Sequence, residues 1–260
     1  VTAEHGMAVR TAMLWCGAWT LVFTIPTFLV LRDDPAPCGT RLGVIGSYRA
    51  LLATIARLWR QDRRIVWFLL ASALFRDGLT GIFTYGGALA RNTFGFSAGQ
   101  VVVFGAAANV IAGGATICSG RLDDRIGPRA VIVDSLVMLV ALATAVFCLH
   151  TRGSGVFWVL GLALCVFVGP AQAASRSHLA RIIPPGSGGE VFGPHARRPG
   201  ASPRPLAPLM FGPCVGLGAR PTGAENTQYF GIIGIAVVLA AGLLVLLARV
   251  PQAAAGRGRG

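Results

Sequence analysis

The sequence contains no lysine, and only ten of its 260 residues are acidic. All 23 basic residues are arginines, giving a net charge of +13, but they lie between hydrophobic blocks and form no single basic face. This distribution argues against nucleic acid as a partner and favours arginines at lipid headgroups. Charged residues make up 13% of the chain and hydrophobic residues 54%. A soluble domain of this length needs more polar surface, so the composition predicts an integral membrane protein.

Signatures of enzymes and metal sites are also scarce. The six cysteines lie mostly inside apolar runs and include no Cys-x-x-Cys pair, so we expect packing residues and no metal site. The four histidines lie in loops or at helix ends, without an acidic partner at helical spacing. No phosphate-binding loop is present, which argues against ATP-driven transport. We therefore expect no enzymatic activity and no cofactor.

Hydrophobic windows long enough to cross a bilayer recur along the chain. About 20 helical residues span the hydrocarbon core, and six such windows are present: 12–31, 65–89, 98–118, 130–149, 155–174 and 229–248. A seventh window, 206–219, is shorter and contains two prolines. The sequence therefore predicts an all-α integral membrane protein, a helical bundle of about seven transmembrane helices.

The arginines predict the orientation of this bundle. Alternate connections and the C-terminal tail hold 18 arginines, against four near the other face. Cytoplasmic loops accumulate positive charge, so we expect a multi-pass protein of the cell membrane, its N-terminus outside and its C-terminus cytoplasmic. The alternation holds only if window 206–219 crosses the membrane. The expected parts are a first transmembrane helix at 1–31, a cytoplasmic linker at 32–64 with an amphipathic helix at 43–60, a six-helix bundle at 65–249 and a tail at 250–260.

A charged pair, Arg76 and Asp77, lies inside the second window. At about 1.5 Å per residue the pair falls near the bilayer midplane, where charges are costly unless they are paired or hydrated. We interpret it as a candidate for substrate binding, with Asp77 as a candidate for proton coupling; the alternative is a structural pair inside the bundle. Asn109 is a second polar group at similar depth, and Thr84 and Tyr85 lie two turns beyond Asp77. They are weaker candidates for substrate contact, since such residues more often make interhelical hydrogen bonds.

A charged loop at 120–129 separates two apolar windows and follows the spacing Gly-x-x-x-Asp-Arg-x-Gly-x-Arg, formed by Gly120, Asp124, Arg125, Gly127 and Arg129. The glycines permit close helix approach and a turn with positive φ. We expect Asp124 at a helix N-terminus, and the two arginines in the headgroups or paired with acids. The alternative, an ordinary charged hairpin, does not explain the joint match of all five positions.

The loop at 120–129 is similar to the signature that joins the second and third helices in each half of a major facilitator superfamily transporter. The chain resembles the C-terminal half of such a transporter, over residues 10–193 and 206–248. Several segments further resemble the vacuole-effluxer-like subfamily, which includes autophagy-related amino-acid effluxers: the Asp77-Gly78 step, 169–177, 181–184 and 190–193.

This resemblance implies a site near the midplane between two six-helix halves, and a conformational latch at 120–129 that docks on the opposite half. It also implies a helix-end motif with Gln172, Ser175 and Arg176 at the cytoplasmic face. The N-terminal half of such a fold would be a missing partner. The Pro/Arg-rich stretch 194–205 departs from the subfamily, and we interpret it as read out of frame; the alternative is a lengthened cytoplasmic loop before a short helix.

These observations favour a secondary active transporter, or a truncated remnant of one, that moves a small solute by alternating access. Amino acids are one candidate class of solute. Two other classes remain open. One is a non-transporting structural or assembly membrane protein, or an inactive fragment. The other is a membrane-embedded enzyme, which would need clustered catalytic side chains facing a cavity.

Overall fold

The computed structural model describes residues 3–30, 56–57, 59–60, 62–183, 209, 211–216 and 228–250. The chain divides into two units, residues 1–48 and 49–260, which we describe separately. The first unit contains α1 (Ala3–Val30), a 28-residue helix with Pro26 inside it. The predicted window 12–31 falls on this helix. Its large apolar side chains are exposed, among them Trp15 and Trp19, as suits a helix that meets lipid or another protein.

The second unit is a bundle of long helices. Its described elements are α3 (Arg63–Asn92), α4 (Ala98–Ile126), α5 (Pro128–Cys148), the 3-10 turn η1 (His150–Arg152), α6 (Ser154–Ile182) and α9 (Phe230–Arg249). The five α-helices of this unit are long and apolar enough to cross a membrane. They are the candidate spans found in the described part of the chain. They coincide with five of the predicted windows. The all-α membrane fold predicted from the sequence is confirmed.

Local sequence explains where these helices begin and turn. Ser97 and Gln100 form a capping box at the start of α4, in which each side chain bonds the other residue's backbone N–H. Asp62 caps α3 by accepting from the Arg64 N–H at 2.9 Å. Gly127 joins α4 to α5 with φ +86°, a conformation that glycine adopts without steric cost. This positive-φ turn was predicted from the sequence and is confirmed.

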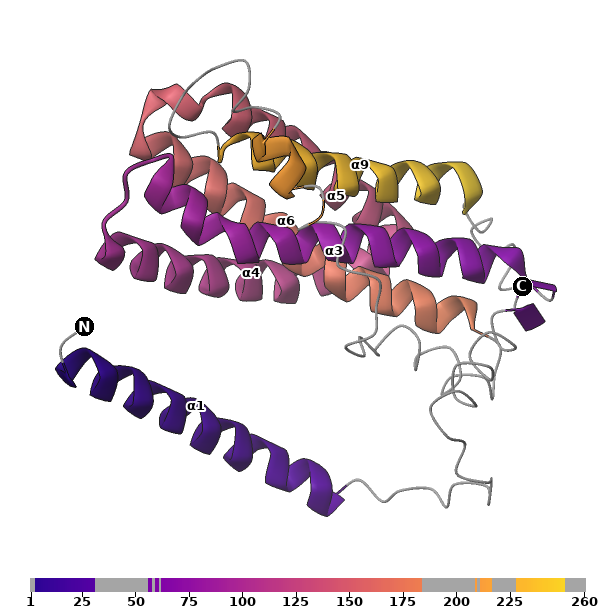
Figure 1. The fold of residues 1–260 in the computed structure, drawn as a ribbon. Coiled ribbons are helices and arrows are strands. Elements are labelled where there is room, and N and C mark those ends of the chain that lie inside the picture. Colours follow the sequence, from indigo (N-terminus) through magenta and orange to yellow (C-terminus); the bar gives the residue numbers. More distant parts are fainter. Residues whose placement is uncertain are drawn as a thin grey trace. The chain divides into compact units, whose positions relative to one another are not determined.

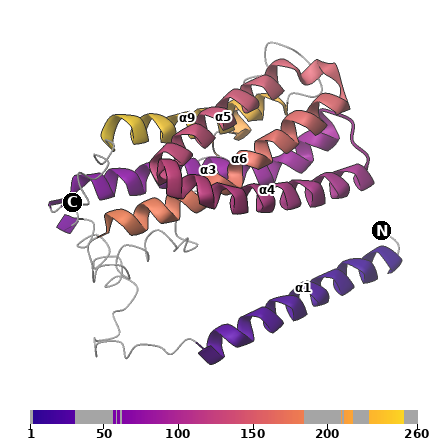
Figure 2. The same cartoon turned by 180° about the vertical axis from the view of Figure 1, so that it is seen from behind.

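The helices run side by side, with α4 and α9 at opposite edges of the bundle (Figures 1 and 2). α3 packs on α9, α5 lies between α6 and α9, and α4 packs mainly on α6. In its most apolar stretch α4 is only 11% buried, whereas the corresponding stretches of the other four helices are 39–50% buried. α4 therefore presents most of its surface outside the bundle.

Glycines set the closest helix contacts. A Cβ added at Gly242 would lie 2.9 Å from the backbone nitrogen of Phe75, and one at Gly78 would lie 2.8 Å from Leu239. Small residues let helices in a membrane approach closely. The close contact at Gly78 joins the middle of α3 to α9.

Several predicted segments fall largely outside the described residues. They are most of the linker 32–64 and its amphipathic helix 43–60, the Pro/Arg-rich stretch 194–205 and the tail after residue 250. The described linker residues 56–57 and 59–60 are helical. In window 206–219 the described residues, 209 and 211–216, are also helical. That this window crosses the membrane stays a prediction.

Candidate functional site

The Arg76–Asp77 pair lies at the centre of the 30-residue helix α3. Asp77 is 5% exposed, while Arg76 is half-buried. Gly78 follows directly and brings α9 against this point through Leu239. The two charged side chains therefore differ in environment: Asp77 is enclosed by the bundle and Arg76 reaches its surface.

A polar stripe, made of Arg76, Thr80 and Thr84, follows one face of α3. The three residues are spaced four apart, so they lie above one another on the helix. Both threonines are exposed. The hydroxyl of Thr80 donates to the Arg76 carbonyl at 2.9 Å, and that of Thr84 to the Thr80 carbonyl at 2.9 Å. Each hydroxyl keeps its lone pairs as acceptors on the open side. Our sequence reasoning did not include Thr80, although its spacing from Arg76 was a usable signal.

The other polar candidates, Tyr85 on α3 and Asn109 on α4, have separate partners. The ring of Tyr85 stacks on Phe211, with centroids 3.9 Å apart. Asn109 is exposed, and its amide donates to the carbonyl of Gly105, one turn earlier in α4, at 2.8 Å. The expected interhelical hydrogen bonds are wrong for Asn109 and Thr84, because both side chains bond the backbone of their own helix.

The structure corrects two expectations for the 120–129 loop. Asp124 lies in the last turn of α4, so it is at a helix C-terminus and not at an N-terminus. A carboxylate there is disfavoured by the helix dipole and needs a cation nearby. Gly120 is exposed, and a Cβ at this position would meet nothing within 4 Å in the described residues. Hence no close helix contact forms there.

Arg129 connects the loop to the end of the bundle's last described helix. Its Nε donates to the carbonyl of Val250 at 2.8 Å, across 121 residues of sequence. Val250 is the C-cap of α9, and a cation is favoured at a helix C-terminus. Arg125 is exposed. We call the end of the bundle that carries residues 120–129 the loop end.

An ionic cluster at the loop end joins α4 to α6. Arg181 of α6 lies 3.8 Å from Asp123 and 3.7 Å from Asp124, both carboxylates of α4. Asp123 is 8% exposed and His178, one turn before Arg181, is 7% exposed. The His178 ring packs on Phe68 of α3, with centroids 4.6 Å apart. Sequence reasoning missed this cluster, although His178 and Arg181 are spaced to share one face of α6.

The helix-end motif lies just before this cluster on α6. The hydroxyl of Ser175 donates to the carbonyl of Gln172 at 2.7 Å, and Ser175 is 1% exposed. Arg176 is exposed. Within the same run, a Cβ at Gly169 would lie 2.6 Å from the carbonyl oxygen of Ala112. The run 169–177 thus contributes a tight contact between α6 and α4, at Gly169, and one exposed charge, at Arg176.

Tryptophans and arginines gather near the loop end. The guanidinium of Arg249 lies 5.0 Å from the ring centre of Trp67, and that of Arg63 lies 5.7 Å from the ring of Trp59. Tryptophan and arginine are typical of the membrane–water interface, where an amphipathic ring meets headgroups. Such contacts suit helix ends that lie at a membrane surface.

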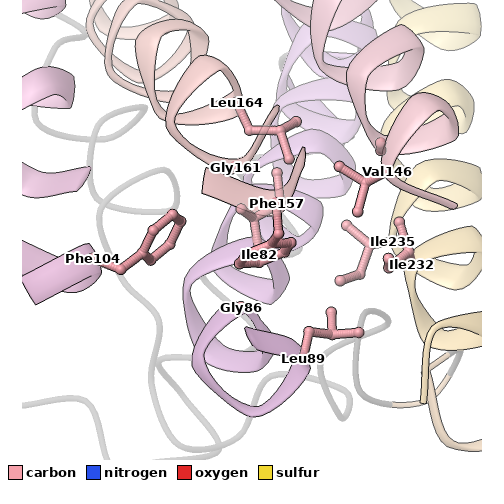
Figure 3. A pocket seen from close by; sticks show the side chains of 11 residues that line it. Ile82, Gly86, Leu89, Phe104, Val146, Phe157, Gly161, Leu164, Ile232 and Ile235 are labelled. Atoms are coloured by element: carbon pink, nitrogen blue, oxygen red, sulfur yellow. The ribbon is translucent and has the colours of Figure 1, made fainter. Parts of the chain in front are cut away.

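An apolar cavity of about 60 Å³ lies in the half of the bundle remote from the loop end (Figure 3). It is lined by Ile82, Gly86, Leu89, Phe104, Ala143, Val146, Phe157, Gly161, Leu164, Ile232 and Ile235. Such a lining offers no partner to a charged solute. Elsewhere in the described part of the chain, no group of three or more His, Cys, Asp or Glu side chains is placed to hold a metal ion.

The fold and the α3 stripe define a class, namely multi-pass all-α membrane proteins in which one long apolar helix carries a polar face near its centre. Residues 1–194 match the family described as "Vacuole effluxer Atg22 like", and the chain belongs to this family. It is 26% identical over 241 residues to an uncharacterized MFS-type transporter, YxiO, of Bacillus subtilis (strain 168). That alignment covers 90% of this chain and 52% of the relative, so the chain spans about half of its length. No solved structure matches significantly. The predicted resemblance is confirmed.

Proposed function

We propose that this chain is the solute-binding part of a secondary active transporter that moves small zwitterionic solutes, such as amino acids, by alternating access. The polar stripe on α3 carries the proposal. A face with an arginine and two exposed hydroxyls at the centre of a spanning helix is costly against lipid. It is favourable where it lines a water-filled path closed by further helices, which we propose are a second half-transporter.

The stripe offers complementary groups for the two charges of an amino acid. The Arg76 guanidinium suits a carboxylate, which it binds through two parallel hydrogen bonds. Thr80 and Thr84 already donate their protons to backbone carbonyls, so towards the solute they act as acceptors. Acceptors suit an ammonium group, which carries only donors.

We further propose that Asp77 couples transport to a proton. It is buried directly beside Arg76 and against the α3–α9 contact. A change in its charge would alter how α3 packs on α9, and this connects protonation to conformation. Transport that stays proton-driven after Asp77→Asn would contradict this role.

The loop end supplies the proposed gate. The pairs from Arg181 to Asp123 and Asp124 hold α4 against α6, and the bond from Arg129 holds α5 against the end of α9. Pairs of this kind have two discrete arrangements, formed and broken, as a latch requires. We place this end at the cytoplasmic face, because the arginine-rich connections emerge there.

The test is uptake and efflux of a panel of labelled amino acids in vesicles containing the chain together with any further helices that its gene encodes. We expect Arg76→Gln to raise KM at least about tenfold, the effect of losing a charged hydrogen bond. Thr84→Val should also raise KM. Its matched control is Thr144→Val on α5, because Thr144 is exposed and makes the same kind of bond, to Val140 at 2.8 Å.

Equal effects of Thr84→Val and Thr144→Val would contradict a solute path along α3. Uptake of none of the panel by the wild-type protein would remove amino acids as the solute. The 260-residue chain by itself serves as the negative control, since one face of its α3 has no described helix to close the path.

A further inference from the structure

His178 of α6 is a buried ionisable side chain at the loop end that the proposed gate does not use. It is 7% exposed, and its ring packs on Phe68 of α3, which is fully buried. Among the described residues, its Nε2 has no hydrogen-bond partner. In the imidazolium form this nitrogen would carry an N–H without an acceptor, and burial disfavours a charge. The packing therefore favours the neutral ring.

Charged groups from three helices act on this ring. They are Asp123 of α4, Arg129 of α5 and Arg181 of α6, while α3 contributes the apolar ring of Phe68. Two of the three charges are cations, which repel an imidazolium. The one carboxylate, Asp123, is already paired with Arg181 at 3.8 Å. The charges at the loop end therefore oppose a proton on His178, as its burial does.

Separation of α4 from α6 would change the surroundings of His178. While the two helices are packed, the ring is shielded from water. Once they separate, water reaches the ring and hydrates its charge, and an imidazole in water takes up a proton at about pH 6.5. The separated arrangement therefore binds the proton more tightly than the packed one. By linkage, the packed arrangement is fully favoured above about pH 6.5 and loses that preference as the pH falls below it.

We propose that His178 is a proton-binding site of the loop end, at which protonation separates α4 from α6 and weakens the ion pairs that Arg181 makes with α4. This role rests on the proposed function, in which those pairs form the gate. Acid at the loop end then opens the gate. The site is distinct from Asp77, whose proposed role is proton coupling at the centre of α3.

The chain, with any further helices that its gene encodes, is reconstituted in lipid vesicles, and the distance between α4 and α6 is measured by pulsed electron spin resonance. Spin labels are attached to cysteines introduced at Ile126 and Ala180, exposed neutral residues near the loop end, after the native cysteines are replaced by alanine. Spectra are recorded at about pH 8 and about pH 5.5, on either side of the titration of an imidazole and above that of a carboxylate. Since the lower pH is about one unit below the pKa of a solvated imidazole, the ratio of separated to packed arrangements should rise about tenfold.

Two neutral variants at His178 identify the site of the proton. His178→Gln keeps a polar side chain and His178→Phe keeps a ring against Phe68, so both should hold α4 and α6 packed at either pH. His150→Gln, at the opposite end of the bundle, is the matched control and should keep the wild-type response. A wild-type distance that is equal at both pH values or shorter in acid, or a His178 variant that still responds, would overturn the proposal. The distances require no solute, so failure of amino-acid uptake leaves this test intact, and a missing pH response beside normal uptake removes this site alone.

Discussion

Replacing Gly242 by alanine tests how tightly α9 packs on α3. The added Cβ would lie 2.9 Å from the Phe75 nitrogen, 3.0 Å from the Phe75 Cβ and 3.3 Å from the Ala71 carbonyl oxygen. Two of these atoms belong to the backbone and the third is a Cβ, which is fixed to the backbone. None of them can move away by a side-chain rotation. The helices must separate by several tenths of an ångström along their contact. Overpacking costs about 1–3 kcal/mol, and alanine regains about 0.5–1 kcal/mol of helix propensity. We expect a net loss of about 1–2 kcal/mol in the free energy of unfolding.

Alanine substitutions at two further glycines extend the test, because the structure predicts a different change in stability at each position. At Gly78 the new Cβ would meet Leu239 at 2.8 Å, but the contacted atoms, Cγ and Cδ2, belong to a side chain that can rotate. We expect Gly78→Ala to cost at most about 1 kcal/mol. At Gly86, which lines the apolar cavity, a Cβ meets nothing within 4 Å. Gly86→Ala should therefore stabilise the protein by about 0.5–1 kcal/mol.

The measurement is equilibrium unfolding of the three variants in mixed micelles with increasing denaturing detergent, followed by helical circular dichroism. The expected order of stability is Gly86→Ala, then Gly78→Ala, then Gly242→Ala. The reasoning is refuted if Gly242→Ala is as stable as Gly86→Ala, because the contact between α3 and α9 would then be looser than the structure has it.

Three other substitutions probe the loop end and the stack on α3. Gly127→Ala should lower stability by about 1–2 kcal/mol, since φ of +86° is strained for alanine; thermal unfolding measures it. Arg181→Gln should cost about 1 kcal/mol, less in high salt, because it leaves the buried Asp123 without its ion pair. Tyr85→Ala removes the stack on Phe211, worth about 1 kcal/mol, and should speed proteolysis around residues 211–216.

Each of these variants has a matched control. Gly120→Ala, in the same loop motif, adds a Cβ to open space and should change stability by less than about 0.5 kcal/mol. Arg176→Gln removes an exposed arginine of α6 that has no ion pair among the described residues. Phe83 is 44% exposed on α3, and Phe83→Ala should leave proteolysis unchanged. A control that behaves like its partner variant would show that the named contact is not the cause.

The positions of the helices could be predicted from the sequence because apolar length is a local property. Five windows fell on α3, α4, α5, α6 and α9. Two of these helices, α4 and α6, continue well past the C-terminal ends of their apolar windows, because hydropathy does not determine where a helix ends. The positive φ at Gly127 was also predictable, because a glycine in a short turn between two helices is a local signal.

The partners of each helix could not be predicted, because lipid and bundle interior are both apolar. A helix apolar all round gives no pattern that distinguishes its buried face. Asn109 was therefore expected to contact substrate or another helix and is exposed, with its amide bonded to its own helix, whereas Asp123 was passed over and is buried. The cluster of Asp123 and Arg181 joins residues far apart in sequence, and Asp124 was assigned to the wrong end of a helix.

The bond between Arg129 and Val250 has a consequence for biosynthesis. The arginine lies in the first turn of α5, and its acceptor follows 121 residues later. A ribosome that adds about 5–20 residues per second needs roughly 6–24 seconds to reach that carbonyl. During this interval the Arg129 guanidinium lacks the carbonyl acceptor that it has in the folded bundle. The bond between α5 and the end of α9 can therefore form only late in biosynthesis, after α9 has been synthesised.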